Sequence, residues 1–151
     1  MGAESRLREL GITLPPVQKA AGTYLRAVRT GNLLFVAGHG PIRADGSIIV
    51  GKLGRDLESD AGYEAARVTG LAVLATIRDA LGSLDAVTKF VRVGGFVNAT
   101  PDFKEHPKVV NGASDLFVEV FGDAGRHARV AVGYASLPFN IAVEIEAVVE
   151  V

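Results

Sequence analysis

The chain contains no cysteine and no tryptophan, and its net charge is only −1 at neutral pH. The absence of cysteine excludes disulfide bonds, thiolate metal ligands and a cysteine nucleophile, and it suits a reducing compartment. The near-zero charge argues against nucleic-acid binding, because such proteins neutralise phosphates with a basic surface. No apolar stretch reaches about 18 residues without a charge, and the first ten residues lack an apolar signal core. We therefore predict a cytoplasmic protein that binds neither nucleic acid nor membrane.

What the chain does have is enough apolar material for one folded domain. It is 151 residues long, with 48% hydrophobic and 22% charged residues, which is the range of globular proteins. Residues 1–17 are expected to form an N-terminal arm, with a helical turn at residues 4–10 and a stop at Pro15-Pro16. Residues 1–151 are thus predicted to form a single domain with this arm at its start.

The order of expected strands and helices predicts an α+β fold. Strands are expected from alternating or β-branched segments at residues 24–28, 33–37, 47–50, 87–97, 130–132 and 141–151. Helices are expected at about residues 59–81 and 108–121, and a bulge is expected at Gly94-Gly95. We predict a mixed sheet of about six strands with both helices on one face. The other face would be bare and half apolar, which favours self-association.

The last 27 residues carry the strongest functional signal. Arg129 precedes a short apolar run, and Glu144 lies on the polar side of the alternating segment at residues 141–151. The planar fork of an arginine binds a carboxylate through two parallel hydrogen bonds. A carboxylate close to such a ligand could hold or deprotonate a water molecule. Composition leaves open the alternative that Arg129 and Glu144 pair with each other or face solvent.

Other common chemistries have no support in the sequence. Gly38-His39-Gly40 lacks the remainder of either nucleotide-binding fingerprint. The three histidines do not have the spacing of metal ligands, so no metal site is predicted.

Three stretches together resemble the Rid family (RidA/YjgF), the enamine/imine deaminases formerly labelled endoribonuclease L-PSP. The first spans residues 24–42, and the second is the long helix followed by residues 87–93. The third and most specific stretch reads Ala128-Arg129-Val130-Ala131-Val132, then Ser136-Leu137-Pro138, then Val143-Glu144-Ile145-Glu146-Ala147. The residues of the third stretch and the presence of the N-terminal arm resemble the longer branch of that family, whose members have roughly 150 residues.

The resemblance implies a chorismate-mutase-like α+β fold and a homotrimer with clefts between its subunits. It implies hydrolysis of reactive 2-enamine/2-imine carboxylic acids to a 2-keto acid and ammonia, with no cofactor. Because the imine carbon is already electrophilic, positioning of the acid and of a water supplies most of the acceleration needed. The alternative function is non-catalytic binding of a small carboxylate such as a 2-keto acid. Ribonuclease activity is a distant third, because the chain has no basic patch.

The resemblance also implies roles for individual residues. Arg129 would grip the substrate carboxylate, and Glu144 would position the attacking water. Tyr24 would be the cleft tyrosine, Asn111 a polar residue near the site, and Gly38 a backbone contact.

Two positions depart from the family pattern. Ala131 stands where cysteine is common, and His39 stands where glutamine is common. Both are expected to line the cleft, which would then be more open or would hold a new titratable group.

Overall fold

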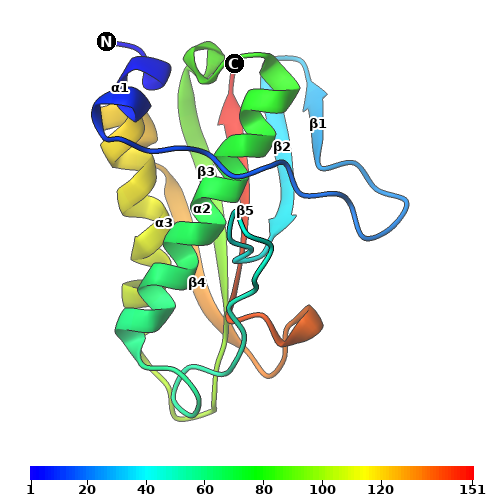
Figure 1. Cartoon of the computed structure of the whole chain (residues 1–151), viewed down its shortest axis with the longest axis vertical. Helices are drawn as coiled ribbons and strands as arrows, with labels where there is room; N and C mark the ends of the chain where they lie inside the picture. The colour runs from blue at the N-terminus through cyan, green and yellow to red at the C-terminus, as the bar shows by residue number, and fades with distance from the viewer.

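The computed structural model describes all 151 residues and contains one five-stranded sheet and three α-helices. The strands are β1 (Ala27–Thr30), β2 (Leu33–His39), β3 (Lys89–Asn98), β4 (Ala128–Tyr134) and β5 (Val143–Glu150). The helices are α1 (Ala3–Glu9), α2 (Ser59–Leu81) and α3 (His106–Phe121), as labelled in Figure 1. The predicted α+β class is confirmed.

The strands lie in the order β1-β2-β5-β3-β4. The central strand β5 is antiparallel to both of its neighbours, β2 and β3. Strand β4 is parallel to β3, and α3 forms the crossover that such a pair requires. Strands β1 and β4 are therefore the two edges of the sheet.

Helices α2 and α3 pack against each other on one face of the sheet, as predicted (Figure 1). Glycine permits their close approach, because a Cβ atom on Gly112 would overlap the carbonyl oxygen of Tyr63. A Cβ atom on Gly62 would lie 2.8 Å from the side chain of Val109. Small residues at this contact therefore set the spacing of the two helices.

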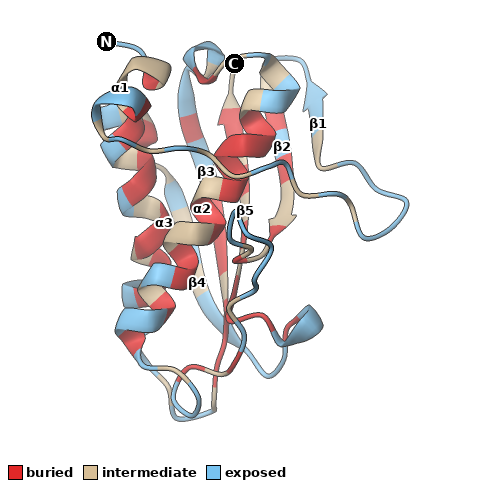
Figure 2. Cartoon of the chain, in the orientation of Figure 1, coloured by how far each residue is buried: buried red, intermediate tan, exposed pale blue.

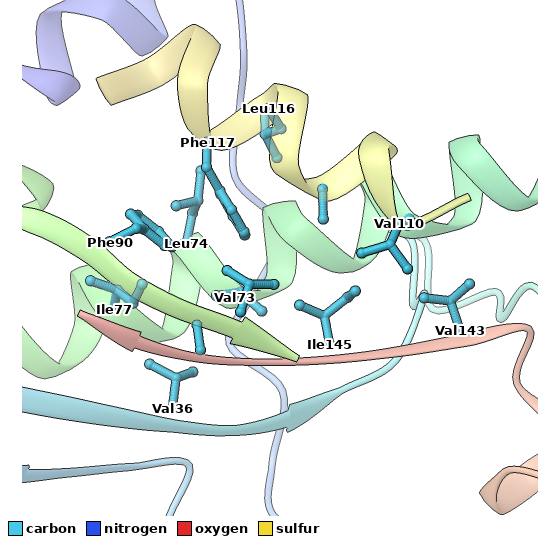
Figure 3. Packing of buried hydrophobic residues seen from close by; sticks show 14 of the residues in the cluster. Val36, Val73, Leu74, Ile77, Phe90, Val110, Leu116, Phe117, Val143 and Ile145 are labelled. Carbon is cyan, nitrogen blue, oxygen red and sulfur yellow. The ribbon is translucent and has the colours of Figure 1, made fainter. Parts of the chain in front are cut away.

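The hydrophobic core lies between these helices and the sheet, where Figure 2 shows the buried residues. Strand β5 contributes every second residue to it, including the fully buried Val143 and Ile145. The rings of Phe90 on β3 and Phe117 on α3 stack with centroids 4.4 Å apart. Figure 3 shows these side chains beside Ile77 of α2. Burying side chains of this size contributes about 2 kcal/mol each to folding.

The opposite face of the sheet has no helix over it, as predicted (Figure 1). It carries Phe35, Val132 and Tyr134, which are 47%, 41% and 49% exposed. Glu144 and Glu146 of β5 point to the same face, where Glu146 pairs with Arg92 at 2.9 Å. This face is thus a mixture of exposed apolar side chains and carboxylates.

Some predicted elements differ from the structure. The sheet has five strands rather than six, because residues 47–50 make only isolated bridges to Ile42 and Ile141. The first strand starts at Ala27 rather than at residue 24. The bulge predicted at Gly94-Gly95 lies instead between Phe90 and Arg92. The two glycines keep their register and have another role, because a Cβ atom on Gly95 would overlap the side chain of Val110 in α3.

The N-terminal arm packs onto the domain. Glu4 of α1 accepts two hydrogen bonds from Arg78 near the end of α2, at 3.0 and 2.7 Å, and a third from the backbone of Leu84. After α1 the arm crosses α2 (Figure 1), and Ile12 and Leu14 contact the core there. None of the helices is long and apolar enough to span a membrane.

Candidate active site

Arg129 lies on the edge strand β4 and points toward α3. Its Nη1 donates to Oδ1 of Asn111 at 2.8 Å and to Oγ of Ser114 at 3.1 Å. Its Nη2 donates to the carbonyl of Pro107 at 3.5 Å. Burial lowers the pKa of Arg129 from its ordinary value, but a guanidinium stays charged. Because all three acceptors are neutral, the guanidinium is held in place while its charge remains available to an anion.

Ser114 and His127 extend this arrangement into a chain of hydrogen bonds. The Nδ1–H of His127 donates to the carbonyl of Gly125 at 2.7 Å, so Nε2 is the acceptor nitrogen of the neutral ring. Nε2 lies 2.9 Å from Oγ of Ser114, which therefore donates to it. The same oxygen accepts from Arg129. Burial lowers the pKa of His127, which keeps the ring in this neutral form.

A second group of predicted residues lines a small cavity of about 210 Å³ on the open face of the sheet. Tyr24, Gly38 and Glu144 all contribute to its wall. A Cβ atom at position 38 would lie 2.7 Å from Oε1 of Glu144, so only glycine leaves room for the carboxylate. Burial raises the pKa of Glu144, and the neighbouring Glu146 raises it further, while Arg26 opposes the shift. Glu144 is therefore a carboxylate with increased basicity.

Arg26 organises this cavity. Its Nη1 donates to the hydroxyl of Tyr24 at 3.3 Å and to the carbonyl of Gly38 at 3.1 Å. Its Nη2 donates to Oε1 of Gln18 in the N-terminal arm at 3.2 Å, whereas its buried Nε has no partner. The pKa of Tyr24 is lowered by a hydrogen bond from the backbone of Ala21 and by Arg26. Arg26 thus fixes both the phenol and the backbone beside Glu144.

The prediction for the side chain of His39 is corrected by the structure. Strand β2 spans three residues from Val36 to His39 while β5 spans two, from Ala147 to Ile145. This bulge changes which side chains point inward, so His39 follows Val36 into the core. His39 is only 1% exposed, and its Nε2 contacts Oγ1 of Thr76 at 2.7 Å. It therefore adds no titratable group to the cavity.

The two groups of residues lie on opposite faces of the sheet. Arg129 pairs in register with Val93, whose side chain is in the core, and Ala131 shares its face of β4. Glu144 pairs with Phe96 and points to the open face. Arg129 donates its hydrogen bonds to Asn111, Ser114 and Pro107 and none to Glu144. The alternative that these two residues form an ion pair with each other within one chain therefore does not hold. One copy of the chain does not bring Arg129 and Glu144 together.

The chemistry of the two groups is complementary. The group around Arg129 can bind an anion, and the cavity around Glu144 can accept a proton or hold a water. No three histidine, aspartate or glutamate side chains are placed to hold a metal ion.

Comparison with known proteins identifies the family. Residues 4–150 match the family model described as "YjgF/chorismate mutase-like, putative endoribonuclease". The chain belongs to the YjgF/chorismate mutase-like family. The prediction of a Rid-family member with this fold is therefore confirmed.

Several members of the family are similar over nearly the whole chain. The Trypanosoma cruzi protein TCP17 is 45% identical over 97% of this chain and 92% of its own length. The solved structure of Atu1372 from Agrobacterium tumefaciens, whose function is unknown, is 43% identical with a TM-score of 0.89, covering 99% and 91% of the two chains. A Shewanella oneidensis structure bearing the endoribonuclease label is 34% identical with a TM-score of 0.96 over the full length of both chains.

Within this YjgF-like domain, three residues of the candidate site were not predicted from the sequence. Ser114, His127 and Arg26 reach the site from α3, from the segment before β4 and from the segment before β1. His127 could have been predicted from the sequence, because it lies only two residues before Arg129. Ser114 had a weaker one, because it lies three residues after Asn111 and so on the same side of α3.

Proposed function

We propose that this protein is a hydrolytic deaminase of reactive 2-enamine/2-imine carboxylic acids, releasing a 2-keto acid and ammonia. The observation that carries the proposal is Arg129, a fixed cation whose hydrogen-bond partners are all neutral. Such a group suits the carboxylate that every substrate of this class carries. Its position on an edge strand makes it accessible to another copy of the chain.

The active site would be shared between two copies in a homotrimer. The group around Arg129 in one copy would face the cavity around Glu144 in the next. The exposed apolar side chains of the open sheet face support association, because a surface of this kind is commonly buried between subunits. The separation of Arg129 and Glu144 in one chain supports it too, since the chemistry requires both.

The reaction uses only groups that the chain supplies. Arg129 holds the substrate carboxylate, and Glu144 takes a proton from a water as its oxygen attacks the imine carbon. Glu144 returns that proton to the nitrogen, which gives a carbinolamine. It then transfers the hydroxyl proton to the same nitrogen, the carbon–nitrogen bond breaks, and ammonia leaves as the keto group forms. The raised pKa of Glu144 brings it closer to neutral pH, where a general base is most effective. Tyr24 would donate a hydrogen bond from its hydroxyl to the bound substrate.

The alternative is a non-catalytic binding protein for small carboxylates, which would use Arg129 in the same way. One solved structure of this fold, Escherichia coli TdcF, was determined with bound serine; it is 23% identical to this chain with a TM-score of 0.64. At that identity the likeness concerns the fold alone. Ribonuclease activity remains the weakest candidate, because the net charge is −1 and phosphate binding depends on positive charge.

Ammonia release tests the proposal. 2-Iminopropanoate is generated by an amino-acid oxidase, and release is compared for the wild type, Arg129→Ala and Glu144→Gln. We expect acceleration over buffer that both variants lose, while the control Arg126→Ala keeps it, because Arg126 is exposed and paired with Asp123 at 3.2 Å. No acceleration by the wild type, with keto-acid binding that depends on Arg129, would establish the binding protein instead.

Mixing the two inactive variants tests the shared site. If each site takes Arg129 from one copy and Glu144 from the next, random trimers of Arg129→Ala and Glu144→Gln contain about a quarter of intact sites. Refolding them together should restore about that fraction of wild-type activity. A mixture as inactive as its components would rule out a site formed between copies.

A further inference from the structure

A second and larger cavity of about 540 Å³ lies at the end of β4. Its wall is formed by the loop around Lys52 and Arg55, by Thr100, by His106 at the start of α3, and by Tyr134. None of the residues that line it is acidic. Arg55 is already neutralised, because its guanidinium donates two hydrogen bonds to the carboxylate of Asp56 at 3.1 and 2.9 Å. Lys52, by contrast, forms no ion pair, so its charge remains available to a ligand in this cavity.

The ammonium group of Lys52 is fixed by neutral acceptors. Its Nζ donates to Oδ1 of Asn98 at 2.9 Å and to the carbonyl of Ala135. Asn98 is only 1% exposed, and its Nδ2 donates to Oδ1 of Asn140 at 3.0 Å and to the carbonyl of Ile141 at 3.1 Å. An ammonium has three N–H donors, so one remains free. A flexible lysine is thus held by a buried amide. Its ammonium group forms no ion pair, although, after the hydrogen bond from Arg55, its charge is one of the smaller contributions that lower the pKa of Asp56, whose carboxylate accepts from the Lys52 backbone at 2.9 Å.

This cavity begins close to Arg129. Residues 129, 131 and 133 share one face of β4, and the two that follow Arg129 are the small Ala131 and Gly133. The ring of His106 lies against Gly133 where a side chain would otherwise be. The next carbonyl along α3, that of Pro107, accepts the hydrogen bond from Arg129. Because His106 lines the cavity and its neighbour Pro107 contacts Arg129, the guanidinium and the cavity lie next to each other at the start of α3.

We propose that Lys52 binds a second acidic group on the ligand of Arg129, so that the preferred substrates are 2-imino acids whose side chain ends in a carboxylate. This inference rests on the proposed function, because it assumes that Arg129 binds the first carboxylate. The rings of Phe103 and His106, packed edge-on at 5.2 Å, and the ring of Tyr134 provide an apolar wall for the connecting methylene groups. A fixed cation of this kind discriminates strongly, because a ligand without the matching anion leaves it unpaired.

Keto acids serve as stable probes of this preference. Calorimetric titration compares 2-oxobutanoate, which has one carboxylate, with 2-oxoglutarate, 2-oxoadipate and 2-oxopimelate, which have two. We expect the best diacid to bind the wild type roughly tenfold to a hundredfold more tightly than 2-oxobutanoate, the range for one charged hydrogen bond. The chain length that binds best would report the span between Arg129 and Lys52.

Two matched substitutions identify the residue responsible. Lys52→Gln removes the charge but keeps a donor for Asn98, and it should lose the diacid preference while binding 2-oxobutanoate as before. Arg55→Gln makes the same kind of change in the same cavity, where the cation is already paired, and should keep the preference. Thermal unfolding verifies that both variants are folded.

The outcomes separate this inference from the proposed function. Equal binding of monoacid and diacids by the wild type overturns the role of Lys52 whatever the variants do, and it leaves the deaminase proposal intact. A diacid preference that persists in Lys52→Gln also overturns it. Loss of all binding in Arg129→Ala supports the common carboxylate site. A wild type that binds none of the four acids overturns the role of Lys52, and the ammonia-release assay then decides the deaminase proposal separately.

Discussion

Burial of His39 should make the stability of this protein depend on pH between about 6.5 and 4. Burial, together with the nearby charge of Arg26, lowers the pKa of His39 from 6.5 to about 4. The ring is neutral in the folded state, where it donates to the carbonyl of Ala37 and accepts from Thr76. The unfolded chain keeps the ordinary pKa, so between these two values it binds a proton that the folded chain does not. This contribution to stability is complete above pH 6.5 and is lost as the pH falls toward 4.

The size of the loss follows from the two pKa values. One pKa unit corresponds to about 1.4 kcal/mol, so the difference between 6.5 and about 4 corresponds to about 3 kcal/mol in full. By pH 5 about 2 kcal/mol of it has been lost, because the unfolded chain is almost fully protonated there and the folded chain is not. A loss of this size is a large fraction of the stability of an ordinary domain.

The substitution that isolates this effect is His39→Gln, since glutamine does not titrate and can both donate and accept in the same place. Urea unfolding of both proteins is measured from pH 7.5 to pH 5 at one protein concentration. The free energy of unfolding of the wild type should fall by about 2 kcal/mol relative to the variant, because effects of other groups cancel in the difference. A difference that stays constant within about 0.5 kcal/mol would refute the buried neutral ring, as would a proton NMR titration of His39 with a midpoint near 6.5.

Three further substitutions test other parts of the structure. Gly112→Ala places a methyl group against the carbonyl of Tyr63, so we expect a loss of about 3 kcal/mol in urea unfolding; a neutral result would contradict the close contact of α2 and α3. Ser114→Ala removes one support of Arg129, and calorimetry should show keto-acid affinity reduced about tenfold with little change in thermal stability, whereas unchanged affinity would leave Ser114 without a role in the site. Burial raises the pKa of Glu144, so the wild type loses stability as pH rises through that pKa; Glu144→Gln should therefore unfold at a higher temperature at pH 7 but gain little at pH 4, and an equal gain at both values would disprove the shift.

The regular parts of the fold could be predicted because their side-chain patterns are local. Strict alternation in the last strand placed Glu144 and Ile145 on opposite faces, and the structure confirms this. Helical spacing and a terminal glycine likewise located α2 closely. The side chain of His39 could not be placed, because the bulge in β2 depends on pairing with β5, more than 100 residues later. Nothing in the local pattern around Gly38 indicates that extra residue.

The supporting residues of the site could not be predicted for a similar reason. Arg26 touches Gly38 and Gln18 only because the arm returns to β2, and Lys52 touches Asn98 across 46 residues of sequence. Each of these residues is an ordinary surface type in the sequence. Their roles follow from tertiary contacts, which periodicity does not encode.

The central position of β5 has a consequence for how the protein is made. This strand lies between β2 and β3, and it is synthesised after all the others. Until it emerges from the ribosome, only the pairs β1 with β2 and β3 with β4 can form, and the inner edges of both pairs have no partner. Unpaired strand edges are sites of aggregation, so chaperones should matter most at this stage. The sheet is completed from its middle, and a stop codon anywhere before Val143 should yield insoluble product rather than a partly active domain.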